Sequence, residues 1–107
     1  MSIQSTTEAI LSHYGAKLAS ATPEQQQTLK DRVLEAETKL RVTVYWEAHR
    51  MVILGNCGKH LSRIGEWMDC SCHAFQCSGS GHENKQPCKH LVVLARWVSE
   101  NLRTTGE

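Results

Sequence analysis

Two short pairs of metal-binding residues near the C-terminus constrain this 107-residue chain more than any other feature. Cys70 and Cys72 form a Cys-x-Cys pair, Cys88 and His90 form a Cys-x-His pair, and fifteen residues separate the two pairs. Three thiolate sulfurs and one imidazole nitrogen fill the corners of a tetrahedral zinc site and leave no position for a catalytic water. We therefore predict one structural Zn²⁺ ion bound by Cys70, Cys72, Cys88 and His90.

The local sequence indicates how each pair reaches the metal. A one-residue spacing lets Cys70 and Cys72 project to the same side of a strand or knuckle. After His90, an apolar pattern at helical spacing predicts a helix, with the members Leu91, Leu94, Ala95, Val98 and Leu102. Cys88 would then lie at the helix start, where the positive end of the helix dipole favours a thiolate.

The segment between the pairs is rich in Gly and Ser at residues 78–81 and needs a cross-link to hold its ends together. A disulfide could provide one. With five cysteines, an odd number, and no signal peptide, we expect instead a metal site in a reducing compartment, the cytoplasm or nucleus. The loop also carries His73, Cys77 and His82, which are possible competing donors.

Cys57 and His60 stand beside a Gly-rich turn. Two interpretations are open for them: a separate or alternative metal site, or a free thiol in a turn. Of the two, we favour the free thiol in a turn.

The first forty residues predict two helices, which we treat as an N-terminal helical arm, residues 1–40. One helix is expected from Thr7 to Ser20, weakened by Gly15. A second is expected to run from Pro23 to Leu40, with Thr22 as N-cap and a capping box. We expect the two to pack as a hairpin on a sheet, or else to present the apolar stripe of the second helix to a partner.

Residues 41–107 predict a small antiparallel sheet followed by the metal-binding segment and the C-terminal helix. Alternating β-branched and aromatic residues indicate a strand over 41–46, a turn over 47–50 and a returning strand over 51–54. Residues 60–69 are expected to form a third strand that ends at the first cysteine pair. Trp46 and Trp67 are expected to line the sheet, and Trp97 to be exposed. The predicted fold class is α+β.

The segment from Trp67 to Phe75, followed by Pro87 to Leu91, resembles a SWIM zinc finger, a family defined by Cys-x-Cys, a variable gap and Cys-x-His. The resemblance covers residues 41–103 and all four ligand positions, although His73 stands where Pro is commoner. It implies a structural zinc and binding to DNA in recombination, transposition or transcription. It also implies a second possibility, because some small SWIM proteins are obligate partners of recombinase mediators.

Charge alone does not select the partner. The net charge is +1, and zinc with three thiolates would bring the protein near zero. Scattered cations could still gather in the fold, and the candidate nucleic-acid contacts are Arg63, Lys85, Lys89 and Arg96. We expect a binding module, not an enzyme, since no catalytic dyad or phosphate loop accompanies the motif. We expect no membrane and no small-molecule substrate; the alternative is an adapter or homodimer.

Overall fold

The computed structural model describes residues 2–80 and 84–102. The elements, in chain order, are α1 (Ile3–Ala19), α2 (Pro23–Lys39), β1 (Arg41–Glu47), β2 (Arg50–Asn56), β3 (Leu61–Ile64), β4 (Met68–Cys70), α3 (His73–Gln76) and α4 (Lys89–Asn101). The strands form one antiparallel sheet in the order β1-β2-β3-β4. The predicted α+β class is therefore confirmed. In this described part of the chain, no helix is both long and apolar enough to cross a bilayer.

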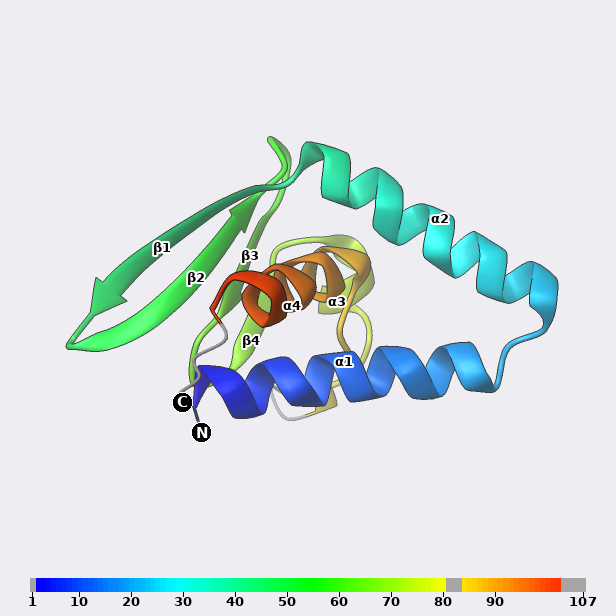
Figure 1. Ribbon diagram of the computed structural model, residues 1–107, viewed down its shortest axis with the longest axis horizontal. Coiled ribbons are helices and arrows are strands. Elements are labelled where there is room, and N and C mark those ends of the chain that lie inside the picture. The colour runs from blue at the N-terminus through cyan, green and yellow to red at the C-terminus, as the bar shows by residue number, and fades with distance from the viewer. Residues whose placement is uncertain (1, 81–83, 103–107) are drawn as a thin grey trace.

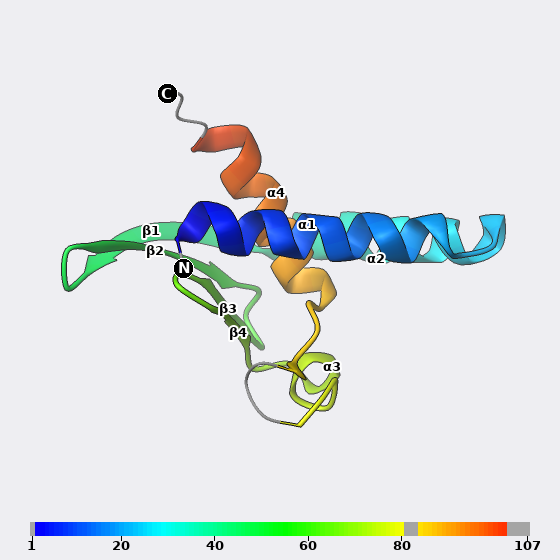
Figure 2. The ribbon, with the colours of Figure 1, turned by 90° about the horizontal axis from the view of Figure 1, so that it is seen from below.

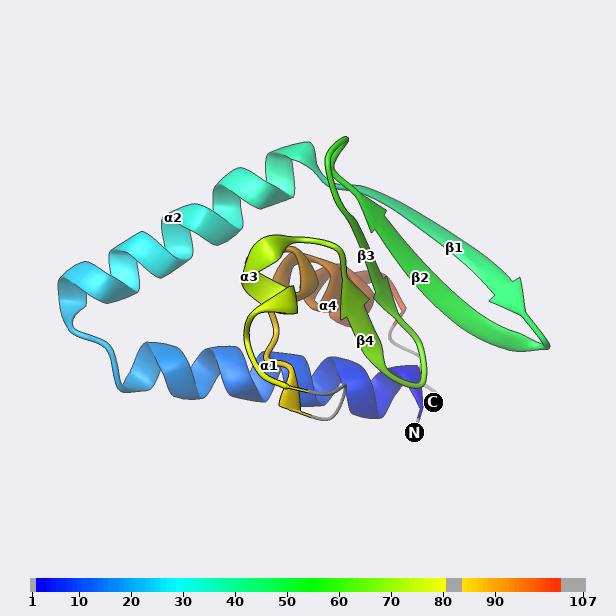
Figure 3. The ribbon, with the colours of Figure 1, turned by 180° about the vertical axis from the view of Figure 1, so that it is seen from behind.

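Helix α4 lies at the centre of the molecule. Figure 1 shows it between α1 and α2, and Figure 3 shows β3 and β4 covering it from behind. Every residue from His90 to Ala95 is buried. A helix that is buried all round needs cover on several sides, and here the two N-terminal helices and the sheet supply it together.

The N-terminal helices do not pack against each other as predicted. They diverge from their connecting turn (Figure 1) and overlap in the view from below, where α4 crosses them (Figure 2). Each helix contacts α4 far more than it contacts the other helix. Ile10 of α1 and Val33 and Ala36 of α2 belong to the same buried cluster as Leu91 and Leu94 of α4. The apolar stripe of α2 is therefore covered by this chain's own helix, which leaves little of it for a partner.

Local signals explain where the helices begin. The Thr22 hydroxyl accepts a hydrogen bond from the Gln25 N–H at 3.2 Å, and the Gln25 side chain accepts one from the Thr22 N–H at 3.0 Å. This capping box confirms the predicted start of α2. Helix α1 begins earlier than predicted, at Ile3, because the Ser2 side chain caps it by accepting from the Ser5 N–H.

The sheet has one more strand than predicted. The turn between β1 and β2 is the expected one, with Ala48 and His49 both at positive φ, as a two-residue hairpin requires. The predicted single strand over 60–69 is wrong, because the chain reverses after Ile64. The N–H of Gly65 donates to the carbonyl of Trp67 there, and β4 returns alongside β3.

The three tryptophans differ in burial, and Trp46 lies in strand β1 of the sheet as predicted. The β1–β2 hairpin extends past α4 in Figure 1, so no other helix or strand of the described residues covers its outer end. Trp46 is consequently 65% exposed, and Trp67, beside the β3–β4 turn, is 49% exposed. Trp97, expected to be exposed, instead packs half-buried against the core. The burial of these side chains depends on how much of the sheet α4 covers. The alternation of residues along a strand does not show this.

Candidate metal centre

The fold brings the four predicted metal ligands together. Strand β4 ends at Cys70, Cys72 is the N-cap of α3, Cys88 is the N-cap of α4, and His90 lies in the first turn of α4. Their ligand atoms all lie within 4.8 Å of one another, and all four residues are buried. Two segments separated by the Gly- and Ser-rich loop thus meet at one point between the sheet and α4.

The distances suit a zinc ion. Nδ1 of His90 lies 3.8 Å from the sulfur of Cys70 and 3.8 Å from the sulfur of Cys88. Zinc–sulfur bonds of about 2.3 Å and zinc–nitrogen bonds of about 2.0 Å place neighbouring ligands of a tetrahedron about 3.5 to 3.8 Å apart. One metal ion can therefore be held by Cys70, Cys72, Cys88 and His90 with little movement of the side chains.

The electrostatics of the cluster also favour a cation. A hydrogen bond from the Cys70 thiol lowers the pKa of Cys88, and the same bond raises the pKa of Cys70. Burial raises the pKa of Cys72, and the Cys88 thiolate raises the pKa of His90. Without a metal, the buried site thus resists carrying three thiolates. A divalent cation would offset their charge and allow all three to ionise.

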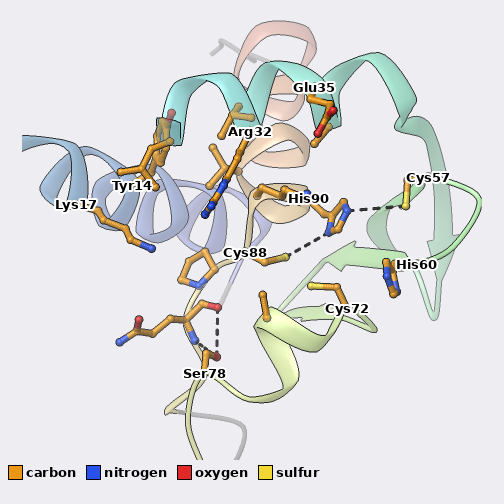
Figure 4. A pocket seen from close by; sticks show the side chains of 18 of the residues that line it. Tyr14, Lys17, Arg32, Glu35, Cys57, His60, Cys72, Ser78, Cys88 and His90 are labelled. Carbon is orange, nitrogen blue, oxygen red and sulfur yellow. Dashed lines mark hydrogen bonds between the residues drawn. The ribbon is translucent and has the colours of Figure 1, made fainter. Parts of the chain in front are cut away.

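The second nitrogen of His90 faces a residue that the sequence did not assign to the site. Nε2 lies 3.9 Å from the sulfur of Cys57, in the turn between β2 and β3 (Figure 4). Burial alone would raise the pKa of Cys57, but backbone N–H groups of Lys59 and His60 hydrogen-bond to the sulfur and lower the pKa overall. The preferred interpretation of Cys57 as merely a free thiol in a turn therefore missed its contact with a metal ligand.

His60 also borders the cluster. Its ring centroid lies 5.7 Å from that of His90, and its Nδ1 lies 3.5 Å from the Ser71 hydroxyl. Cys57 and His60 thus stand against the four-ligand cluster and not at a separate place. In the sequence, the indication that these two residues could be near a metal was that Cys57 and His60 lie close together beside a turn.

Comparison with protein-family models, with curated proteins and with solved structures finds no match for this chain.

The other predicted donors are elsewhere. His73 and Cys77 face each other on the short helix α3, with the sulfur 3.5 Å from Nε2, and both are exposed. Neither belongs to the metal-ligand cluster found among the described residues. His82 lies outside the described residues.

The four candidate nucleic-acid contacts have different environments. Arg63 forms an ion pair with Glu47 at 2.7 Å and lies over the ring of Trp67. The Lys85 ammonium donates hydrogen bonds to the backbone carbonyls of Gln76 and Gly79, so it closes the loop after α3. Lys89 is exposed at the start of α4, beside Cys88, and Arg96 is half-buried two turns further along.

Proposed function

We propose that this protein is a zinc-stabilised module of the SWIM type that binds nucleic acid, with DNA as the expected partner, and that it is not an enzyme. The observation that carries the metal part is the buried set of three cysteines and one histidine, whose ligand atoms lie within 4.8 Å of one another. Four protein ligands complete a tetrahedral zinc, so the ion stabilises structure and does not activate water.

Unpaired positive charge near the metal centre supports nucleic acid as the partner. Lys59, in the turn between β2 and β3, and Lys89, at the start of α4, are exposed and line the same pocket as Cys88 and His90. Neither forms an ion pair with a described carboxylate. Neutralising phosphates supplies most of the non-specific affinity of a protein for nucleic acid. A context of recombination, transposition or transcription is proposed on the SWIM resemblance alone.

The test is a fluorescence-anisotropy titration of zinc-loaded protein against labelled single- and double-stranded DNA at two salt concentrations. We expect micromolar or tighter binding that weakens as salt rises, and weaker binding by Lys89→Glu. Absence of binding to either DNA at low salt would contradict the proposal.

One observation favours a second candidate function, a protein-interaction adapter or homodimer. Val44 and Trp46 lie on the same face of β1 and are 39% and 65% exposed at the uncovered end of the hairpin. Exposed apolar side chains grouped in this way often mark protein contacts. A mass that increases with concentration in light scattering, and that Trp46→Thr returns to the monomer value, would support this candidate.

A further inference from the structure

A groove with uncompensated positive charge runs between α1 and α2 and ends on the metal centre. It encloses about 650 Å³, and its floor includes Cys72, Cys88 and His90 (Figure 4). Its cationic side chains come from four parts of the chain and are Lys17, Arg32, Lys39, Lys59 and Lys89. We call this surface the basic groove. Glu35 is the single carboxylate among the described residues that line it.

The cations of the basic groove have no partner among the described residues. All five are exposed, and none forms an ion pair or side-chain hydrogen bond with another described residue. By contrast, Arg50 pairs with Glu66, Arg63 pairs with Glu47, and Lys85 binds backbone carbonyls. Lys30, Arg41 and Arg96, outside the groove, are likewise unpaired within the described part of the chain. What distinguishes the groove is that it gathers five unpaired cations around a single described carboxylate, which produces a local positive field. Such a field attracts and concentrates polyanions.

The shape of the groove indicates which polyanion can enter. In Figure 4 the Lys17 and Arg32 side chains reach from facing helices toward the space beside Cys88. The groove has a volume of about 650 Å³, a size typical of a site for one small ligand. A few nucleotides of a single strand match a site of this size, whereas a duplex presents two paired strands.

The lining also offers rings for bases. His13 and Tyr14 on α1 and His60 beside the metal centre line the groove and are partly exposed. Single-stranded nucleic acid is typically bound by a cationic groove that follows the phosphates, with aromatic rings against which bases stack.

We infer that the basic groove binds a short stretch of single-stranded nucleic acid, with phosphates on Lys17, Arg32 and Lys89 and bases against Tyr14 and His60. This inference rests on the proposed function, because it requires that the protein bind nucleic acid at all. Of the four nucleic-acid contacts predicted from the sequence, only Lys89 lines the basic groove. The inference therefore places the binding surface mostly on other residues. Cys72, Cys88 and His90, three of the residues that would hold the metal, line the same groove.

Charge reversal at matched positions of α2 tests the inference. Arg32 lines the groove, whereas Lys30, two residues earlier on the same helix and also exposed, does not. Full-length zinc-loaded Arg32→Glu and Lys30→Glu would be titrated with fluorescein-labelled oligothymidylate of about 10 nucleotides, within the usual site size of such proteins. We expect Arg32→Glu to bind at least about tenfold more weakly with a smaller salt dependence, and Lys30→Glu to bind within about twofold of wild type. Circular dichroism and zinc content should be unchanged in both.

Each other outcome has a distinct meaning. Equal losses in the two variants would place the nucleic acid elsewhere and overturn the groove while the proposed function stands. Tighter binding of a duplex than of oligothymidylate would overturn the single-strand assignment. If inorganic tripolyphosphate displaces the oligonucleotide at equal phosphate concentration, the groove binds anions in general, and the single-strand assignment is overturned. Failure of the wild-type protein to bind any DNA at low salt would overturn the proposed function together with this inference.

Discussion

The sulfur of Cys57 lies 3.9 Å from Nε2 of His90, while Nδ1 of the same ring faces the sulfurs of Cys70 and Cys88. A metal-bound histidine generally donates its second ring N–H to a fixed acceptor, which orients the ring and raises its basicity. When Nδ1 binds a metal, Nε2 carries the proton and can donate to Cys57. The turn between β2 and β3 therefore helps to position a metal ligand on α4.

Replacing Cys57 should weaken the metal site without removing it. Cys57→Ala deletes the acceptor for His90, and loss of such an acceptor typically lowers metal affinity by about 10- to 100-fold. We expect one zinc per chain to remain, with the lower affinity measured by competition against a chromophoric chelator.

The matched control is Cys77→Ala, which removes an exposed thiol whose recorded contacts are with His73. Its zinc affinity should equal that of the wild type. Loss of stoichiometric zinc in Cys57→Ala would make Cys57 a direct ligand, and an unchanged affinity would show that the contact has no effect on the metal.

Replacing any of the four ligands should abolish stoichiometric zinc and unfold the part of the chain around the site. A structural zinc supplies about 10–16 kcal/mol of apparent binding free energy, comparable with the about 5–15 kcal/mol stability of a small domain. Cys88→Ser is expected to show this in zinc content and circular dichroism, as is the wild-type protein treated with a chelator. A Cys88→Ser protein that keeps its zinc, together with a Cys77→Ser protein that loses it, would refute the assigned ligand set.

Shortening a buried side chain at the centre of α4 should lower the stability of the protein strongly. Leu94 is 0% exposed in the core between the N-terminal helices and the sheet, so Leu94→Ala should lower the free energy of unfolding by about 2–5 kcal/mol. Leu34→Ala on the outer side of α2, where Leu34 is 52% exposed, should change it by about 0.5 kcal/mol or less. Urea unfolding at fixed free zinc measures both. Equal effects would mean that α4 is not the centre of the core.

Replacing Gly15 or Gly58 with alanine should change the stability of the protein in opposite directions. Gly15 lies inside α1 with nothing within 4 Å of an added Cβ, so Gly15→Ala should stabilise the protein by about 0.5–1 kcal/mol. Gly58 has a φ of +94°, which an L-residue adopts only with strain, so Gly58→Ala should destabilise it. Thermal unfolding of zinc-loaded proteins measures both changes. A stabilising Gly58→Ala would contradict the turn geometry beside Cys57.

Much of the fold could be predicted from local signals. Thr22 and Gln25 mark the start of α2, and alternation marks the β1–β2 hairpin, because caps and strand pairs depend on residues close in sequence. The extra turn at Gly65 was missed, since a single glycine between two short strands is a weak signal. The exposure of Trp46 and the burial of Trp97 could not be read from periodicity, because both depend on where α4 ends relative to the sheet.

The four candidate metal ligands and the fold class follow from local features of the sequence. Donor type and spacing are enough to predict which four residues could hold a metal ion, because few donor sets suit a tetrahedral site. Helical and strand periods are enough to predict an α+β chain. Which cationic side chains come together without an ionic partner depends on the tertiary structure. Lys17, Arg32 and Lys89 are far apart in sequence and gather only because α1 and α2 diverge around α4. It also placed Cys57 beside His90, since a contact between residues 33 positions apart exists only once the sheet packs on the helix.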